Sequence, residues 1–426
     1  MVGNKYTKQE KSWMMYDWAN SAYSIIITTA IFPIYYKGVA ENAEVSVANS
    51  TAYLGYTISI ATFILAMLGP ILGTIADYKG MKKKFFLFFF LLGSISTFSL
   101  LFVPTDNWLL LLIVYTVTTI GARGANIFYD AYIVDVTNKE RMGDVSAKGF
   151  ALGYIGSVIP FVICIAVIFL AQLEMVPFSE TTASRIAFVI TALWWIAFSI
   201  PLIKNVKQKH GVEPEPRVIV NSFKRLGKTF KEIKKYRNIF LFLIAYFFYI
   251  DGVGTIISMS TAYGTDLGLG STDLIIALLA VQIVAAPFAV LFGKLATKFG
   301  AKNMIYTGII IYIIVCIYAM FLSTVVDFWI LAMLVATAQG GIQALSRSYF
   351  GQMVPNEKSN EFFGFYNIFG RFAAITGPFL MGVTTQLTGS SALGVFSLII
   401  LFIIGFIVLL FVPDNKADVI EESELM

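Results

Sequence analysis

The chain contains twelve apolar segments, each of about the length that an α-helix needs to cross a lipid bilayer. Unpaired backbone amide and carbonyl groups are costly in hydrocarbon, so segments of this kind fold as helices with internal hydrogen bonds. The pattern predicts an all-α membrane protein with twelve transmembrane helices. The expected spans lie near residues 12–37, 51–77, 85–103, 107–133, 147–171, 185–203, 238–260, 272–296, 302–323, 327–350, 361–385 and 390–412.

The composition indicates the same class of protein. Of the 426 residues, 58% are hydrophobic and only 13% are charged, whereas about a quarter of the residues in a soluble domain are charged. The net charge of +5 comes from basic residues near the ends of the spans, so no nucleic-acid partner is expected. Cys164 and Cys316 each lie within an apolar run, which predicts packed thiols without a disulfide or a metal site.

Positive charge is distributed unevenly among the connections between spans. Lysine and arginine gather in the N-terminal segment, the even-numbered connections and the C-terminal tail, while the odd-numbered connections hold only Lys37 and Arg185. Basic residues stay preferentially on the cytoplasmic side of a membrane. With twelve spans, both termini are therefore expected to be cytoplasmic.

A polar interval separates the first six spans from the last six. It predicts an N-terminal six-helix bundle at 1–203, a basic cytoplasmic linker at 204–237, a C-terminal six-helix bundle at 238–412 and an acidic cytoplasmic tail at 413–426. Apolar residues at helical spacing in the second part of the linker favour an amphipathic helix on the anionic inner leaflet of the bilayer. A solvated basic linker is the alternative for residues 204–220.

The two halves of the chain match each other at an offset of 220 residues. Gly73, Ala76, Gly80 and Lys82 align with Gly293, Ala296, Gly300 and Lys302, and Gly121 and Tyr129 align with Gly341 and Tyr349. A parallel repeat of six helices is typical of secondary transporters that consist of two similar bundles. Asp77 aligns with Thr297, so the second copy lacks this carboxylate.

The connection after the second span combines glycines, an aspartate and a block of lysines. Its glycines allow close approach of helices and a tight turn, and its lysines hold that turn at the cytoplasmic surface. We interpret Gly73, Asp77, Gly80 and Lys82 as a cytoplasmic gating motif, in which Asp77 is a conformational lock. Arg347, near the inner end of the tenth span, is interpreted as a gate or a structural partner.

Polar side chains form stripes along several spans. A charge at the bilayer centre costs about 2.5–3.5 kcal/mol on insertion scales, so it persists only beside a partner or a wet cavity. Polar residues also join helices together, and this is the simpler reading for the serines and threonines. The predicted substrate or proton pathway comprises Asp17, Asn20, Tyr23, Arg123, Asn126, Tyr129, Asp130, Asp251, Gln282, Gln339, Gln343, Asn367 and Arg371.

In the first span, the spacing of the polar residues from Asp17 to Thr28 places them on one face of an α-helix. Asp17 and Asp130 lie toward the ends of their spans, where snorkelling or a lock between helices is the alternative to a ligand role. Arg123 is interpreted as the partner of a substrate carboxylate or of Asp130.

Asp251, close to the middle of the seventh span, is the first candidate for a substrate-amine or proton site. A carboxylate removed from water can take up and release a proton under conditions in which an exposed one stays charged. Gly252 and Gly254 beside it are expected to weaken the helix and to expose backbone carbonyl groups.

Four further strings carry a resemblance to a known family. They are residues 16–23 (YDWANSAY), residues 126–131 together with 149–157 (NIFYDA and GFALGYIGS), residues 248–253 (FYIDGV) and residues 339–348 (QGGIQALSRS). With the glycine–lysine loop, they resemble the subgroup of the major facilitator superfamily that contains the fungal autophagy-related vacuolar amino-acid effluxers and their bacterial relatives. The resemblance implies two pseudo-symmetric six-helix bundles, alternating access around a central cavity and amino-acid efflux as the best-known activity. The compact chain resembles the bacterial members, which implies the plasma membrane.

The sequence and this resemblance together predict a secondary active transporter of a small polar organic solute, an amino acid, with a proton or another ion as the coupling partner. The alternatives are an uncoupled facilitator of a small solute and a membrane sensor that does not transport. An enzyme is not expected, because the chain lacks an HExxH motif and a nucleophile elbow, and its one histidine, His210, lies in a polar loop. No catalytic residue, metal or cofactor is expected, and the predicted oligomeric state is a monomer.

Overall fold

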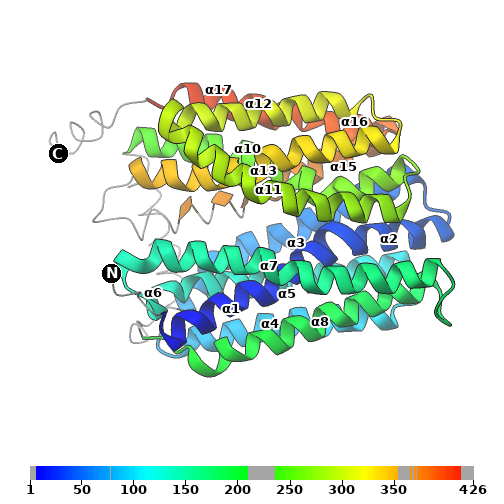
Figure 1. Cartoon of the computed structure of the whole chain (residues 1–426), viewed down its shortest axis with the longest axis horizontal. Coiled ribbons are helices and arrows are strands. Elements are labelled where there is room, and N and C mark those ends of the chain that lie inside the picture. Colours follow the sequence, from blue (N-terminus) through cyan, green and yellow to red (C-terminus); the bar gives the residue numbers. More distant parts are fainter. Residues whose placement is uncertain are drawn as a thin grey trace. The chain divides into compact units, whose positions relative to one another are not determined.

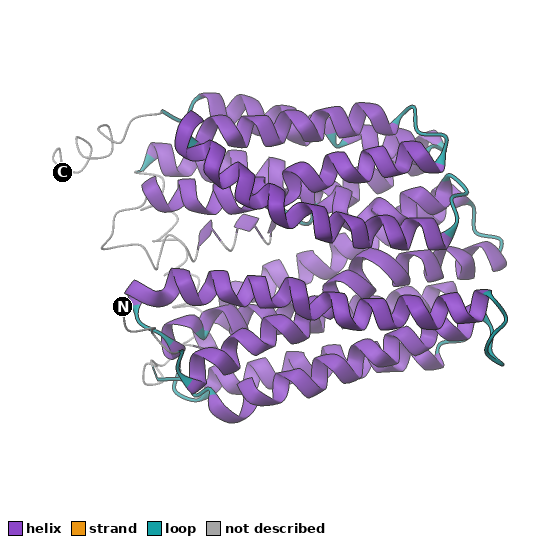
Figure 2. Ribbon diagram, in the orientation of Figure 1, coloured by secondary structure: helices purple, strands orange, loops and turns teal. Residues whose placement is uncertain are grey.

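The computed structural model describes residues 6–76, 78–209, 236–353, 365–366, 369–370 and 372–413. Almost all of these residues are helical (Figure 2). Within the described ranges, ten helices are long and apolar enough to cross a membrane. The prediction of an all-helical, multi-pass membrane protein is therefore confirmed. Cys164 and Cys316 are both buried free thiols, as their apolar surroundings predict.

The chain divides into two compact units, and each is described here by itself. The first unit comprises Met1–Val45 and Phe63–Lys224, and the second comprises Ser46–Thr62 and Arg225–Met426. Helix α3 (Val47–Ala76) contributes to both units, because its first half groups with the second unit and its second half with the first.

The first unit is formed by the helices coloured blue to green in Figure 1. Besides part of α3, they are α1 (Lys8–Tyr23), η1 (Ser24–Ala30), α2 (Ile31–Asn42), α4 (Met81–Ser99), η2 (Leu100–Phe102), α5 (Trp108–Ala131), α6 (Ile133–Val136), α7 (Lys139–Gln172) and α8 (Glu180–Asn205). Helix α1 packs mainly against α7 and α8, and α4 packs mainly against α5.

The first predicted span is helical throughout, but its middle part is not an α-helix. Residues Ser24–Ala30 form the π-helix η1, in which the Thr29 hydroxyl donates a hydrogen bond to the Ser24 carbonyl at 3.1 Å. A π-helix has more residues per turn than an α-helix, so the angle between successive side chains changes after Ser24. The single polar face from Asp17 to Thr28, predicted from α-helical spacing, stays a prediction. π-Helical turns are rare in proteins, and those that occur often lie at functional sites.

Helices α4 and α5 touch through their backbones. A Cβ atom added to Gly121 of α5 would lie 2.3 Å from the Cα atom of Gly93 in α4, so neither position has room for a side chain. Small residues at a crossing let membrane helices approach this closely and gain dispersion contacts along their length. The contact between Gly93 and Gly121 therefore sets the distance between α4, which carries Lys82, and α5, which carries Arg123.

Gly121→Ala is expected to destabilise the protein by about 1–3 kcal/mol, because backbone atoms cannot move aside as a flexible side chain can. Thermal denaturation in detergent measures the change as a lower melting temperature. Gly254→Ala is the matched control, since its added Cβ meets nothing within 4 Å. This control should match or slightly exceed the stability of the unmodified chain, and equal effects of the two substitutions would contradict the packing argument.

The second unit is formed by the helices coloured green to red in Figure 1, together with the first half of α3. They are α10 (Arg237–Asp266), α11 (Ser271–Phe299), α12 (Ala301–Ala319), α13 (Val325–Met353), α15 (Thr376–Thr388), α16 (Ser391–Ser397) and α17 (Ile399–Leu410). Helix α13 packs against α11 and α12, and α10 packs against α17.

The internal repeat is visible in the helix boundaries. Adding 220 to the bounds of α4 gives those of α12, since 81 + 220 = 301 and 99 + 220 = 319. The turns before these helices both use a glycine in the left-handed region, Gly80 with φ 77° and Gly300 with φ 87°. An L-amino acid with a side chain is strained at such angles, so both copies require glycine there.

Two expectations about the second unit are wrong. The eleventh predicted span, 361–385, is not one continuous helix, because residues 373–375 form a turn and α15 begins after it at Thr376. Helix α10 is not weakened at Gly252 and Gly254, since it runs without interruption from Arg237 to Asp266. Gly252 instead makes room for the Phe402 ring of α17, which would lie 2.6 Å from an added Cβ.

Candidate functional site

In the first unit, the polar face of α1 lies against glycines of α7. A Cβ atom on Gly149 would lie 2.5 Å from a carboxylate oxygen of Asp17, and one on Gly153 would lie 2.6 Å from the Ser21 hydroxyl. The string GFALGYIGS therefore gives the polar side chains of α1 space next to the α7 backbone. Asn20, on the same turn of α1, is buried.

Aromatic rings hold the region around Asp17. The rings of Trp13 and Tyr129 stack with their centroids 4.6 Å apart, and the Trp13 indole N–H donates to the Tyr129 carbonyl at 2.9 Å. Tyr16 packs against Tyr129 with a centroid distance of 4.5 Å. Asp17 and Asp130 both lie close enough to Tyr16 and Tyr129 to interact with their hydroxyl groups electrostatically. The structure thus brings Asp17, Tyr129 and Asp130 together.

Arg123 lies in a second group of polar residues, nearer to the start of α5 than Tyr129 and Asp130. The Tyr23 and Tyr115 side chains are within electrostatic reach of its guanidinium group, with Thr119 beside them. Arg123 and Asp130 are seven residues apart on one helix, which is about 10 Å along the axis. One small solute could contact the guanidinium group or the Asp130 carboxylate, but the two charges are too far apart to share one functional group.

Several hydroxyl groups of this region are buried. The Tyr16, Tyr23, Tyr115 and Tyr129 side chains are at most 3% exposed. Polar side chains lie near their hydroxyl groups, among them Asp17 beside Tyr129 and Thr119 beside Tyr23, but none is in good hydrogen-bond geometry among the described residues. Buried polar atoms are almost always satisfied by protein, by ordered water or by a ligand. This face of α1 and α5 is therefore chemically suited to water and polar solutes.

In the second unit, Asp251 is 1% exposed and accepts hydrogen bonds with both carboxylate oxygens. Its Oδ2 accepts from the Gly377 backbone N–H at 2.8 Å, and its Oδ1 accepts from the Thr255 hydroxyl at 3.4 Å. The Thr255 hydroxyl bonds more closely, at 2.8 Å, to the carbonyl of Asp251 itself. The carboxylate therefore connects α10 to the start of α15.

The other predicted residues of the second unit are distributed over α11 and α13. Gln282 is half-buried on α11, Gln339 is buried on α13, and Gln343 is exposed. Ser346, from the same stripe, is a helix contact, because its hydroxyl bonds to the buried Tyr249 hydroxyl at 2.6 Å. Asn367 and Arg371 lie outside the described residues.

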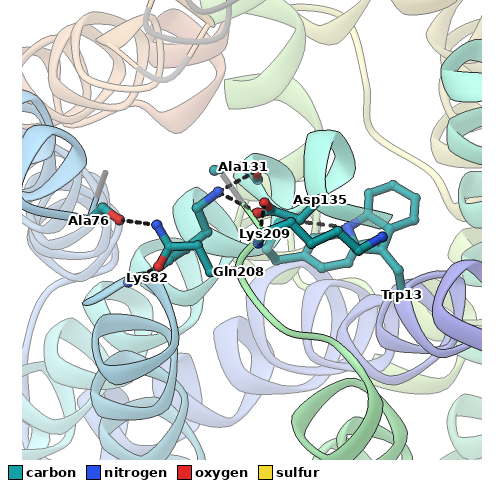
Figure 3. Close-up of polar contacts among 8 residues, drawn as sticks. Trp13, Ala76, Lys82, Ala131, Asp135, Gln208 and Lys209 are labelled. Carbon is teal, nitrogen blue, oxygen red and sulfur yellow. Dashed lines mark hydrogen bonds and ion pairs between the residues drawn. The ribbon is translucent and has the colours of Figure 1, made fainter. Parts of the chain in front are cut away.

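The structure describes most positions of the predicted gating motif. Gly73 lies in α3 and Gly80 forms the turn before α4, while Asp77 lies outside the described residues. Arg347 is an exposed residue of α13. Lys82 is buried, and its ammonium group forms an ion pair with Asp135 at 2.7 Å and donates to the Ala131 carbonyl at 3.0 Å (Figure 3).

The residues at the end of α8 complete this cluster. The Gln208 side chain donates to the Ala76 carbonyl at 3.0 Å and accepts from the Lys82 backbone N–H at 3.3 Å, so it bridges the turn between α3 and α4 (Figure 3). The Lys209 backbone N–H donates to Asp135 at 2.8 Å. Lys82 also lies over the Tyr132 ring, 5.3 Å from its centroid, and burial together with the Asp135 carboxylate raises the pKa of Tyr132. We call Lys82, Asp135, Gln208 and Lys209 the Lys82 cluster.

The repeat also preserves a buried lysine. Lys302, which corresponds to Lys82, is 9% exposed and donates to the Val412 carbonyl, with its ammonium group 5.8 Å from the Tyr306 ring centroid. The Lys82 ammonium group lies within ion-pair distance of the Asp135 carboxylate, and the Lys302 ammonium group donates to a backbone carbonyl. The two copies therefore share a buried lysine at the start of the helix and the turn before it.

Sequence analysis missed Asp135, Gln208 and the role of Gly149 and Gly153. Asp135 follows the fourth span on the side predicted for the lysine block, so opposite charge at the ends of neighbouring helices was an available signal. The glycines are spaced four residues apart, which is the spacing of small residues at a helix crossing. No pattern in the sequence distinguishes Gln208 from the other polar residues after α8.

These features define the class of protein. Helices of spanning length enclose buried charges, and solved structures of major facilitator transporters share the fold. A D-xylose–proton symporter superposes with a TM-score of 0.67 at 14% identity, covering 96% of this chain and 97% of that one. A bacterial homologue of the lysosomal transporter Spinster gives a TM-score of 0.62 at 13% identity, covering 99% and 98%. The chain is a transporter of the major facilitator type and has the fold of transporters, not of enzymes.

The particular family follows from the sequence comparisons. The family model described as "Vacuole effluxer Atg22 like" matches residues 6–142 and 134–421, and the chain belongs to this family. The MFS-type transporter YxiO of Bacillus subtilis (strain 168) is 63% identical over 99% of this chain and 98% of its own length. Autophagy-related protein 22-1 of Aspergillus niger is 23% identical over 88% of this chain and 75% of its own length. The resemblance to the autophagy-related effluxers and their bacterial relatives is therefore confirmed.

Proposed function

We propose that this transporter carries a small polar organic solute, an amino acid, by alternating access and that a proton drives the transport. The description of the family as vacuole effluxers supports a role in moving a solute across a membrane. The D-xylose–proton symporter and the nucleoside transporter NupG share this fold and, as their names say, carry small polar solutes. Within the first unit, the half-buried Asp17 and Arg123 and the buried tyrosine hydroxyl groups supply acidic, basic and polar chemistry for a zwitterionic solute.

The proposal includes a membrane topology. Twelve spans in two six-helix bundles joined by the linker at 204–237 would leave both termini in the cytoplasm, and the distribution of lysine and arginine supports this arrangement. The bacterial relative at 63% identity supports a plasma-membrane location. The protein would then work as a monomer in a bilayer with an anionic inner leaflet.

The observation that carries proton coupling is the Asp251 carboxylate. It is 1% exposed inside a spanning helix, and both of its oxygens accept hydrogen bonds from the protein. Burial disfavours the ionised carboxylate and so favours binding of a proton, whereas a substrate amine would have to displace the Gly377 and Thr255 donors. We therefore assign Asp251 to the proton and leave substrate binding to the polar faces that carry Asp17, Asn20, Tyr23, Arg123 and Gln339.

The function is tested with purified protein in proteoliposomes. Labelled amino acids should exchange across the membrane in counterflow, and an imposed proton gradient should drive their accumulation. Counterflow without an effect of the gradient would favour the uncoupled facilitator. Ligand binding without counterflow would favour the sensor.

Arg123 is the proposed partner of the substrate carboxylate, because its guanidinium group lies beside the buried Tyr23 and Tyr115 side chains. Arg123→Gln is expected to raise the KM for the amino acid about 10- to 100-fold, which corresponds to a charge-assisted hydrogen bond. The same substitution should leave the transport of the matching amino-acid amide nearly unchanged. An equal loss for the acid and the amide would show that Arg123 has a structural role instead.

A further inference from the structure

The start of helix α15 is capped by a carboxylate from another helix: the Gly377 N–H in its first turn donates to the buried Asp251 of α10. Among the helix starts that the structure describes in the second unit, α15 is the only one with such a cap. Helix α15 begins at Thr376, directly after the turn that interrupts the eleventh span. The residue at its N-cap position is Ile375, whose side chain cannot accept a hydrogen bond. The first N–H groups of a helix have no partner within the helix, and a buried helix start needs acceptors from elsewhere.

Asp251 supplies that acceptor. Its Oδ2 accepts from the Gly377 N–H at 2.8 Å, and the N–H and hydroxyl groups of Thr376 also face the carboxylate. A Cβ on Gly377 would lie 2.1 Å from the Thr255 hydroxyl and 2.6 Å from an Asp251 oxygen, so only glycine lets the helix start come this close. The negative charge also complements the positive end of the helix dipole.

The α15 start is held from a second direction by α3. The Ser59 hydroxyl donates to the Ile375 carbonyl at 2.9 Å, and a Cβ on Gly55 would lie 2.5 Å from the Pro378 carbonyl oxygen. These residues of α3 belong to the same unit as α10 and α15. The turn at 373–375 is therefore held between a neutral contact on α3 and a charged contact on α10, and only the charged one depends on a proton.

No charged residue on the described helices that pack against α10 interacts with Asp251. Helices α15, α16 and α17 and the first half of α3 carry no charged residue. On α10 itself, Arg237 and Asp266 are each about 20 Å from Asp251 along the axis. Two other helices carry charged residues: α11 has Asp273, Lys294 and Lys298, and α13 has Asp327 and Arg347. None of these five residues forms an ion pair with Asp251. Arg371 lies outside the described residues.

We propose that Asp251 is a positioning residue that caps the half-helix α15 when it is ionised and releases the start of α15 when it binds a proton. The proton comes from the aqueous phase and bonds to one carboxylate oxygen, which turns an anionic acceptor into a neutral carboxylic acid with an O–H donor. The charge-assisted bond from Gly377 is then replaced by a weaker neutral one. The inference rests on the proposed proton coupling, since it gives the proton a structural consequence at the break in the eleventh span.

The test is hydrogen–deuterium exchange of the full chain in lipid nanodiscs, read in peptides that contain the first turn of α15. Protection factors are compared from about pH 5 to about pH 9, each corrected for the intrinsic exchange rate at the same pH. In the unmodified chain, protection of the Gly377 region should fall about tenfold or more toward low pH, since a charge-assisted bond contributes about 1.5–3 kcal/mol. In Asp251→Asn, protection should be low and independent of pH.

Two further variants serve as controls. Asp327→Asn removes another carboxylate that accepts backbone N–H groups, those of Ser323 and Thr324, and should leave the pH dependence at α15 intact. Thr255→Val removes the hydroxyl group but leaves the contact between Asp251 and Gly377, so the pH dependence of protection at α15 should also remain.

A pH-independent protection factor in the unmodified chain would overturn the proposal, and so would an Asp251→Asn chain protected as well as the original at high pH. The measurement uses neither substrate nor gradient, so it is separate from the transport assay. Proton-driven uptake with unchanged α15 protection would refute only the capping switch, whereas pH-dependent protection without coupled uptake would refute only the proposed transport mechanism.

Discussion

Asp251→Asn is expected to abolish proton-driven accumulation of substrate, with a loss of at least about a hundredfold in the gradient-dependent rate. The substitution preserves size and one acceptor oxygen but removes the group that can take up a proton. Asp251 is 1% exposed, and the described neighbouring helices provide no second carboxylate in contact with it. Uptake into proteoliposomes with and without an imposed pH gradient measures the effect directly.

Counterflow separates loss of coupling from loss of the protein. Exchange of labelled for unlabelled substrate without a gradient should survive in Asp251→Asn at a measurable rate, and the melting temperature in detergent should stay close to the original. Asp266→Asn provides a control on the same helix, because this carboxylate lies at the end of α10 and accepts hydrogen bonds from Thr51 and Ser391. Full gradient-driven uptake by Asp251→Asn would remove Asp251 from the proton pathway.

Lys82→Met is expected to be the most destabilising single substitution in the Lys82 cluster, at about 3–5 kcal/mol, since it leaves a buried carboxylate without its counter-charge. The ammonium group is 2.7 Å from Asp135, and the two side chains are only 5% and 0% exposed. Asp135 would keep the Lys209 N–H as a partner, which compensates only part of the lost attraction. Thermal denaturation in detergent gives the change in melting temperature.

The double variant Lys82→Met with Asp135→Leu tests the cause. Replacement of a buried ion pair by apolar side chains is often neutral or stabilising, so the double variant should recover most of the lost stability. Lys84→Met, two residues along the same helix and exposed, should change stability by less than about 0.5 kcal/mol. Additive losses from the two single substitutions would mean that Lys82 and Asp135 act independently.

The fold class was predictable because the bilayer restricts a chain so strongly. Length and apolarity alone identify spanning helices. The offset of 220 residues anticipates that α12 has the bounds of α4 and that Gly80 and Gly300 both stand in the turns before these helices, each with a positive φ angle. Interruptions within spans were harder to predict. The turn at 373–375 and the π-helix at Ser24–Ala30 depend on contacts with other helices, and Gly252, which suggested a weak point, is a packing position against Phe402.

The candidate site was predictable in its residue types but not in its partners. The sequence predicts that Asp17 and Asn20 share a helix, and both lie on α1, while the mid-span position of Asp251 marks it only as a candidate. It cannot reveal that the Asp251 carboxylate meets the Gly377 N–H, 126 residues away, or that Lys82 meets Asp135, 53 residues away. Pairings over such distances are decided by which helices become neighbours, and that information is spread over the whole set of helix contacts.

The π-helix η1 has a practical consequence for the placement of probes in the first span. Hydrogen bonds to the fifth preceding residue widen the turn, so seven residues in this form rotate α2 relative to α1 away from the angle that a continuous α-helix would give. Pairs of spin labels or cysteines chosen at α-helical spacing on either side of Ser24–Ala30 would point in different directions. Distance measurements on this span should therefore take both labels from α1 or both from α2, and treat each helix as its own frame of reference.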